Sequence, residues 1–459
     1  MGMKLQYNLE NIGNIDKASI TIKPLTIIAG ENSSGKTFVT KSLYTILNSV
    51  YQNHFFRHIF SLYDHFNYLI QHFISEIKNP ASVDEIFEEY FYENREEIVN
   101  ILFYLRDCDF EKEDELIVNN MHVFLEFEEQ IKIYLEERKK LKKFNIHKSL
   151  IVDVIYYVDE FMDALKDRKK IVVDSIGNSL ETGFKKNYQI RNLENLIHRG
   201  KNKSLKLSVD TIGEIEIDLK SKLNFNFFGK GVERVQQIEN IVFFDSPVYI
   251  KIRKALEANK RNIIFRVKDE EKYLKGYPEY LDKLYDFVDK EYIDISDFSE
   301  ISDEIQNIIS GKLDVTKNGD INYTDNENNI IPLSLTAMGI SNIGLIDLLL
   351  RNNVINKGSF LIMDEPEVHL HPEWQVILAQ LLYKIAKSGA NIIIATHSLD
   401  FLKAFENILK EENEIAEEII AINKMPYEES FSEKTELEKV GIVLDDLSRP
   451  FYNLYMQDI

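Results

Sequence analysis

Residues 25–37 (LTIIAGENSSGKT) have the residue types and spacing that most directly suggest chemistry. An apolar run leads to Gly-x-x-x-x-Gly-Lys-Thr, and apolar residues at every fourth position predict a helix after it, which is the context of a P-loop. In a P-loop, backbone N–H groups surround phosphates at a helix N-terminus, the lysine reaches the β- and γ-phosphates, and the threonine ligates Mg²⁺. The predicted phosphate-binding residues are Gly30, Asn32, Ser33, Ser34, Gly35, Lys36 and Thr37, the last also a Mg²⁺ ligand.

A second apolar run, SFLIM, ends in Asp364, Glu365 and Pro366. A buried strand delivers its C-terminal residues to a sheet edge, where Asp364 is predicted to hold Mg²⁺ beside the P-loop. Glu365 is then placed to orient or deprotonate an attacking water molecule. An acidic pair that caps a helix is the alternative for this segment taken alone, and the presence of the P-loop disfavours it.

Histidines follow this acidic pair. His369 and His371 form a His-x-His pattern, but two histidines without clear third and fourth ligands are a weak indication of zinc. His397 ends another apolar run, NIIIAT, at a position from which it could sense the γ-phosphate. The alternative for His397 is a structural role.

Composition limits the class of protein. The chain has 459 residues, more than one compact core usually needs, and its hydrophobic and charged fractions of 44% and 29% are ordinary for a soluble globular protein. The single cysteine, Cys108, excludes a disulfide framework and suits a reducing cytosol. The sequence shows neither a membrane-spanning run nor a signal-peptide core, so we expect a cytoplasmic protein with no membrane partner.

The formal net charge of −21 argues against a surface that binds nucleic acid throughout. Basic runs at 138–143, 166–170 and 199–206 are better explained as solvated helix faces and loops. A local basic face, and with it nucleic acid as a partner, stays open.

The elements that must position the motifs follow from periodicity. Alternation of apolar and polar residues predicts strands within 4–22 and again after residue 205. Residues 51–204 are predicted to be helical, because apolar residues recur three and four apart. Strand and helix alternate between 311 and 425, so we expect an α/β fold.

Taken together, these segments resemble ABC-type AAA ATPases of the group that includes SMC, RecF and OLD-like proteins. The resemblance rests on LENIGNIDKASITIKPLTIIAGENSSGKT, LIMDEPEVHLHPEWQ and ATHSLDFLKAF, and it covers residues 1–48 and 205–459. It implies an ABC-type P-loop ATPase head, with an antiparallel β subdomain and a large helical insertion, that hydrolyses ATP with Mg²⁺. The segments predicted are 1–50, 205–265 and 311–425 for the head, 51–204 for the helical insertion (an arm or oligomerisation element), 266–310 for a helical segment and 426–459 for a tail.

In that group two heads form a dimer around two ATP molecules, each held by the P-loop of one head and a signature segment of the other. The signature segment here is LTAMGISN at 335–342, which opens a helix. The resemblance implies that Glu365 is the catalytic base, His397 the switch residue and Asp364 the organiser of Mg²⁺. The resemblance also implies four further ATP-binding residues, which are Ala337, Met338, Gly339 and His371. His371 lies in the D-loop together with His369.

The signature segment departs from the pattern. Many relatives have two serines before the glycine, where this chain has Ala337 and Met338, and some have a lysine where this chain has Ser341. We therefore expect weak contacts to the γ-phosphate and slow hydrolysis. The Q-loop residue is not assigned, and the candidates are Gln236, Gln237, Asp245 and Ser246.

The segment after the last predicted strand, 426–459, has no obvious metal-binding acid cluster, whereas OLD-type nucleases carry a nuclease domain there. A nuclease or toxin effector is therefore expected as a separate protein. The chain resembles stand-alone ATPase subunits of bacterial anti-phage defence systems such as PARIS, Septu and retron-associated modules. This implies a homodimer of heads, or a higher homo-oligomer, that acts as a nucleotide-dependent clamp or sensor.

Other functions stay open at this stage. A RecF- or SMC-like DNA repair ATPase would need a basic track and stimulation by DNA. A binding-only scaffold would use ATP with little turnover, which the altered signature segment allows. A nucleotide-binding subunit of a membrane transporter is disfavoured by the long helical insertion and by the sequence DEPEVHLHP.

Overall fold

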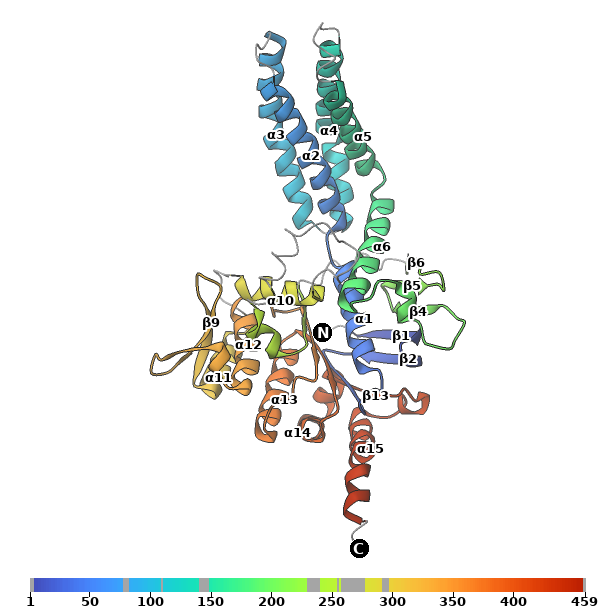
Figure 1. Ribbon diagram of the computed structural model, residues 1–459, viewed down its shortest axis with the longest axis vertical. Helices are drawn as coiled ribbons and strands as arrows, with labels where there is room; N and C mark the ends of the chain where they lie inside the picture. The colour runs from blue at the N-terminus through green and yellow to red at the C-terminus, as the bar shows by residue number, and fades with distance from the viewer. Residues whose placement is uncertain are drawn as a thin grey trace. The chain divides into compact units, whose positions relative to one another are not determined.

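The computed structural model describes residues 4–76, 82–108, 110–139, 148–228, 240–253, 256, 277–290 and 297–456. The chain divides into two compact units, Met1–Tyr51 with Ser179–Ile459, and Gln52–Asn178. We call them the head unit and the helical unit and describe each by itself (Figure 1).

A five-stranded parallel sheet forms the centre of the head unit, with the order β13-β3-β12-β11-β7. Its strands are short, rich in isoleucine and buried on both faces, which is typical of parallel sheets covered by helices. Because all five strands run in one direction, their carboxyl ends meet at one edge. The strands are β3 (Leu25–Gly30), β7 (Ile241–Phe244), β11 (Phe360–Asp364), β12 (Asn391–Thr396) and β13 (Ile420–Met425).

Helices pack against this sheet and against one another. The helix after the P-loop, α1, contacts β12, β11 and β7, and α15 contacts β13 and α14. The helix α12 is buried over most of its length and packs on α11. The helices of the head unit are α1 (Lys36–Val50), α8 (Pro247–Lys251), α10 (Glu279–Asp289), α11 (Ser299–Ile309), α12 (Met338–Arg351), α13 (Pro372–Lys387), α14 (Leu399–Ile419) and α15 (Glu436–Met456).

Two antiparallel sheets complete the head unit. The larger has the order β2-β1-β4-β5-β6, and most of its strands alternate buried and exposed residues, as expected for a sheet with one solvated face. The smaller has the order β10-β9-β8. Their strands are β1 (Leu5–Ile12), β2 (Ile15–Ile22), β4 (Leu205–Val209), β5 (Gly213–Ile217), β6 (Leu223–Phe227), β8 (Gly311–Val315), β9 (Ile321–Asp325) and β10 (Ile330–Pro332). The predicted α/β fold, with an antiparallel subdomain and a helical insertion, is confirmed.

The helical unit is built from α2 (His54–Glu76), α3 (Ser82–Asp107), α4 (Phe110–Lys139) and α5 (Lys148–Lys166), with the beginning of α6 (Arg168–Asn187). Aromatic residues fill its core; the ring of Phe66, for example, lies 5.5 Å from that of Phe161. The unit falls within the predicted insertion 51–204, but the end of α6 and residues 188–204 belong to the head unit. Across the described residues, no helix is both long and apolar enough to cross a membrane.

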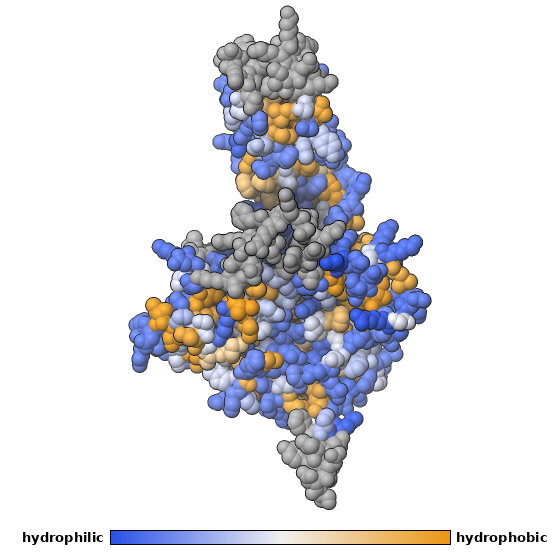
Figure 2. Space-filling view, in the orientation of Figure 1, coloured by the Kyte–Doolittle hydropathy of each residue, from blue (hydrophilic) through white to orange (hydrophobic). Residues whose placement is uncertain are grey.

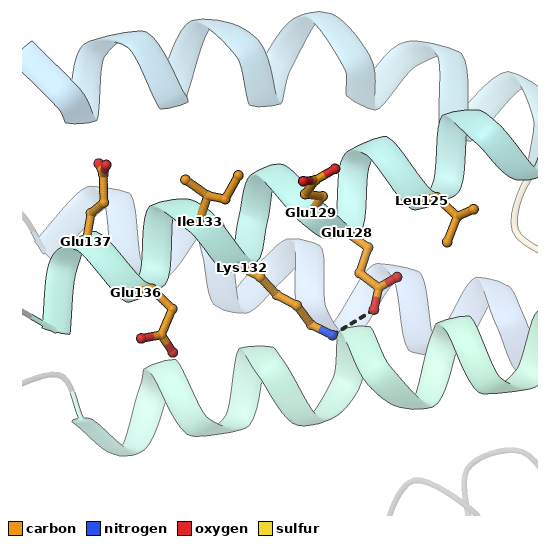
Figure 3. Close-up of a pocket in the computed structure, with 7 residues that line it drawn as sticks. All are labelled: Leu125, Glu128, Glu129, Lys132, Ile133, Glu136 and Glu137. Atoms are coloured by element: carbon orange, nitrogen blue, oxygen red, sulfur yellow. Dashed lines mark hydrogen bonds and ion pairs between the residues drawn. The ribbon is translucent and has the colours of Figure 1, made fainter.

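One side of α4 lines an open cavity of about 570 Å³ in the helical unit (Figure 3). Its lining combines the exposed aliphatic side chains of Leu125 and Ile133 with four glutamates. Lys132 donates to Glu128 over 2.7 Å and pairs with Asp159 over 2.5 Å, so its charge is already neutralised. No residue predicted to bind ATP lines this cavity.

A buried ion pair holds the first turn of α6 against α4. The guanidinium of Arg168 donates to Glu113 over 2.9 Å, and both side chains are buried. Asn53 donates to the same carboxylate over 3.2 Å. Burial nevertheless raises the pKa of Glu113 to about 7, because Arg168 and Asn53 only partly offset the loss of solvation.

Arg168→Ala is expected to lower the free energy of unfolding by about 3–5 kcal/mol at pH 8, because the Glu113 carboxylate would stay buried without its cation. The loss should be smaller at pH 5, where a carboxyl with a pKa of about 7 is protonated and neutral. Urea unfolding followed by circular dichroism at both pH values measures the difference.

Lys166→Ala is the matched control, since its 3.2 Å pair with Asp163 is exposed. It should change the stability by less than about 1 kcal/mol. An equal loss of stability at pH 5 and pH 8 in Arg168→Ala would contradict the assignment of Glu113 as the buried charge.

Candidate functional site

The loop between β3 and α1 has the backbone conformation of an anion-binding nest. Gly35 precedes α1 with φ of 100°, and Ser33 has φ of 65°, so positive φ recurs at alternate residues of the loop, as in a nest. Gly30 pairs with Met425 of β13, and a Cβ atom on Gly30 would lie 2.1 Å from the Met425 carbonyl oxygen. Only glycine fits at this position.

Lys36 is buried at the start of α1 and is held by the loop itself. Its Nζ donates to the carbonyls of Gly30 and Glu31, each over 2.9 Å. Burial lowers the pKa of Lys36, and the carboxylates of Glu365 and Asp364 oppose this change. The ammonium is therefore close enough to the acids at the end of β11 for their charges to act on it.

Asp364, the last residue of β11, is buried beside the P-loop. Its Oδ1 has no hydrogen-bond partner among the described residues. Burial raises the pKa of Asp364 to about 6, hydrogen bonding to Thr37 lowers it, and the charge of Asp245 raises it. An unpartnered carboxylate oxygen next to a threonine hydroxyl fits Mg²⁺, which ordinarily takes its other ligands from water and phosphate.

A cavity of about 250 Å³ opens between these residues. It brings together the predicted metal ligands and the acidic pair with two of the Q-loop candidates, Asp245 and Ser246, whereas Gln236 and Gln237 lie outside the described residues. Asp245 accepts from the Tyr280 hydroxyl over 2.9 Å, which fixes its carboxylate. The lining residues are Thr37, Asp245, Ser246, Asn342, Asp364, Glu365, Pro366, Val368 and His369.

The predicted base and the predicted switch residue are in contact. Oε1 of Glu365 lies 2.9 Å from Nδ1 of His397. The N–H of Glu365 donates to the carbonyl of Ala395 over 2.9 Å, so the pairing of β11 with β12 continues one residue past the strand. Glu365 has φ of 50°, a conformation that is uncommon outside glycine and that often marks functional positions.

A third acid, Glu367, was not predicted. Its side chain is 3% exposed, and Oε1 accepts a hydrogen bond from the hydroxyl of Thr396, while Oε2 has no partner among the residues described. The same hydroxyl accepts from the N–H of Ser398 over 3.1 Å. Glu367 therefore fixes the turn that presents His397, and burial raises the pKa of Glu367. The only signal in the sequence was the third acid of DEPE.

Of the signature segment, Asn342 lines this cavity, but the three residues predicted to contact ATP do not. Ala337 precedes α12, and a Cβ atom on Gly339 would lie 3.2 Å from the ring of Trp374. Neither residue, nor Met338, lines the 250 Å³ cavity. His371 precedes α13, where its ring nitrogen accepts from the N–H of Glu373 over 3.4 Å.

The histidines give no support to a zinc site. Of the residues whose placement is described, no group of three or more His, Cys, Asp or Glu side chains could hold a metal ion. His369 lines the 250 Å³ cavity and also a second one of about 690 Å³. The second cavity is lined by Asn32, Glu367 and His397, and by Leu447 and Pro450 of α15.

The sequence matches the AAA ATPase domain family over residues 3–402. The chain belongs to this family. No curated protein matches it at a significant level. Nothing more specific than an AAA ATPase domain is therefore identified by sequence.

Solved structures with a similar arrangement are SMC head domains. One from Pyrococcus furiosus, with an extended coiled coil and bound to the C-terminal domain of ScpA, is 12% identical over 88% of this chain and 92% of that chain, with a TM-score of 0.38. One from Thermotoga maritima is 11% identical over 88% and 92%, with a TM-score of 0.32. One from Pyrococcus yayanosii, with a coiled coil and joint, is 12% identical over 97% and 99%, with a TM-score of 0.33.

Thr396→Val is expected to slow ATP hydrolysis about tenfold, because the hydroxyl that holds both Glu367 and the turn before His397 is lost. The affinity for ATP should change less than about twofold, since the P-loop is untouched. Steady-state hydrolysis and titration with a fluorescent ATP analogue separate the two effects.

Thr396→Ser keeps the hydroxyl and is the matched control, which should hydrolyse ATP at close to the original rate. If valine and serine give the same rate, the hydroxyl does not position His397. A thermal unfolding curve for each variant excludes loss of the fold as the cause.

Proposed function

We propose that this AAA ATPase domain binds ATP with Mg²⁺ and hydrolyses it to ADP and phosphate. The observation that carries the proposal is the contact between Glu365 and His397 at the sheet edge that also holds Lys36, Thr37 and Asp364. A phosphate-binding loop, a metal-binding carboxylate and a base with an orienting partner are the parts that phosphoryl transfer to water needs.

In this mechanism Lys36 binds the β- and γ-phosphates, and Thr37 and Asp364 would hold Mg²⁺, which would neutralise phosphate charge. Glu365 accepts a proton from the attacking water molecule while the oxygen of that water forms a bond to the γ-phosphorus. The bond from that phosphorus to the bridging oxygen breaks, and ADP keeps the electron pair. His397 keeps the Glu365 carboxylate oriented through the 2.9 Å contact.

We also propose that two heads enclose the nucleotide. The signature residues Ala337, Met338 and Gly339 do not line the cavity of their own head, so they are available to complete the site of another. Leu335, the first residue of the signature segment, is 77% exposed, and Val368 and Val376 are exposed between β11 and α13 and on α13. Apolar side chains at a surface of this kind favour a protein interface. Ala337 and Met338 offer no polar side chain to the γ-phosphate, which supports slow turnover.

The third part of the proposal is that the ATPase controls a separate effector, a nuclease or toxin, in bacterial anti-phage defence. It is supported by the sequence resemblance and by the surface of the helical unit, where Figure 2 shows apolar residues among hydrophilic ones. Large apolar side chains are exposed there and are candidates for a protein contact. They include Tyr68, Tyr104, Val118, Leu125, Ile133, Val152 and Tyr156.

DNA binding has less support. On the larger antiparallel sheet, Lys206 lies between Glu10 and Glu216 on the neighbouring strands. Lys201 pairs with Asp16 over 2.5 Å. Two of the four basic residues in the run at 199–206 thus lie beside acids, which disfavours a continuous basic track.

Glu365→Gln is expected to bind ATP normally while its hydrolysis rate falls about 10²–10⁴-fold, because glutamine cannot accept the proton. ATP-bound dimers should accumulate, which sedimentation or light scattering would detect. Lys36→Ala is the control, because it removes the lysine contact to the phosphates. This variant should neither bind ATP nor form dimers. Turnover at the original rate in Glu365→Gln would show that another group is the base.

An effector should be recovered with the chain when it is affinity-purified from its native host. The comparison uses the original chain, Glu365→Gln with ATP, and Lys36→Ala, with the products of neighbouring genes identified by mass spectrometry. A nuclease or toxin enriched in one nucleotide state is the expected result. Recovery of this protein alone in all three states would contradict the defence proposal and leave the ATPase proposal intact.

A further inference from the structure

The beginning of α12 contacts the turn that carries Glu365, the proposed base. Asn342, in the second turn of the helix, is 2% exposed, and its Nδ2 donates to the carbonyl of Pro366 over 3.1 Å. That carbonyl belongs to the residue directly after Glu365. The bond joins two segments that are 24 residues apart in the sequence and is fully buried.

The orientation of this side chain is set by chemistry. Only the NH₂ group of an amide can donate to a carbonyl, so the amide oxygen must be the atom that has no hydrogen-bond partner among the described residues. Asn342 also lines the 250 Å³ cavity together with Thr37 and Asp364. One side chain thus connects the signature helix, the cavity and the Glu365–Pro366 turn.

Other contacts attach the signature segment to the same surroundings. A Cβ atom on Gly339 would meet both Trp374, at 3.2 Å, and Leu370 of the D-loop, at 3.5 Å. Lys251, just after the Asp245 strand end, donates to the carbonyl of Thr336 over 2.6 Å. Since α12 is buried along most of its length, a displacement at its N-terminus would be transmitted as a movement of the whole helix.

We propose that Asn342 is a positioning residue that couples the signature segment of one head to Glu365 of the same head. The inference rests on the proposed two-head site. In that arrangement the signature segment of a head contacts one ATP, and its Glu365 acts on the other. Asn342 therefore makes the position of the Glu365 carboxylate in one head depend on whether the opposite site is filled. A hydrogen bond of 3.1 Å is lost by a shift of about half an ångström to 1 Å, so a small movement of α12 is sufficient.

Asn342→Leu keeps the size of the side chain but removes the donor. Hydrolysis is expected to slow about tenfold, while the ATP affinity of the single head changes less than about twofold. Asn342→Asp has the same shape but can still donate through its O–H when protonated, so leucine is the variant that removes the donor. Asn352→Leu is the matched control, because Asn352 caps the other end of α12 and donates to the carbonyls of Phe287 and Val288.

Mixed dimers of two differently tagged chains test the coupling itself. One head carries Lys36→Ala and cannot bind ATP at its own P-loop. The signature segment of the second head, which completes that site, then has no nucleotide to contact. When the second head keeps Asn342, the site at the P-loop of that head should hydrolyse ATP about tenfold more slowly than a site in the original dimer. With Asn342→Leu in the second head, the rate should be the same whether or not the opposite site is filled.

The outcomes separate this inference from the function on which it rests. If ATP-bound dimers form in the Glu365→Gln background but the Asn342→Leu head still responds to the empty site, only the coupling is overturned. The coupling is also overturned if the head that keeps Asn342 hydrolyses ATP at the same rate whether or not the opposite site is filled. If no ATP-dependent dimer forms, the two-head proposal and the coupling both fail.

Discussion

The register of the parallel strands is the constraint on which the site depends. Asp364 pairs with Ala395, Thr396 with Ala29, and Gly30 with Met425, so four strands end within one or two residues of one another. A slip of one residue would turn every side chain of a strand to the opposite face. The Glu365 N–H bonded to Ala395 extends this register into the turn and brings Glu365 to His397.

The sequence was sufficient for the parts of the site that are local. The P-loop, the acids after β11 and the histidine after β12 each follow a buried run, and the carboxyl ends of parallel strands must meet. The roles assigned to these residues stay predictions. The α/β fold class could be predicted for the same reason, since helical and alternating periodicities differ clearly.

Contacts between distant segments could not be predicted. The bonds of Asn342 to Pro366 and of Glu367 to Thr396 span 24 and 29 residues, and no periodicity encodes them. The end of the helical unit was hidden for another reason. The helix α6 is continuous from Arg168 to Asn187, but it passes from one compact unit to the other at residue 179. A helical pattern does not indicate where its packing partner changes.

The hydrogen bonds of Lys36 to the carbonyls of Gly30 and Glu31 tie the cation to the loop that precedes it. A buried ammonium without such partners would cost several kcal/mol. Because the partners are backbone carbonyls, the path of the loop and the position of the charge are set together. A change in the loop backbone would therefore also displace the positive charge that Lys36 presents at this edge of the sheet.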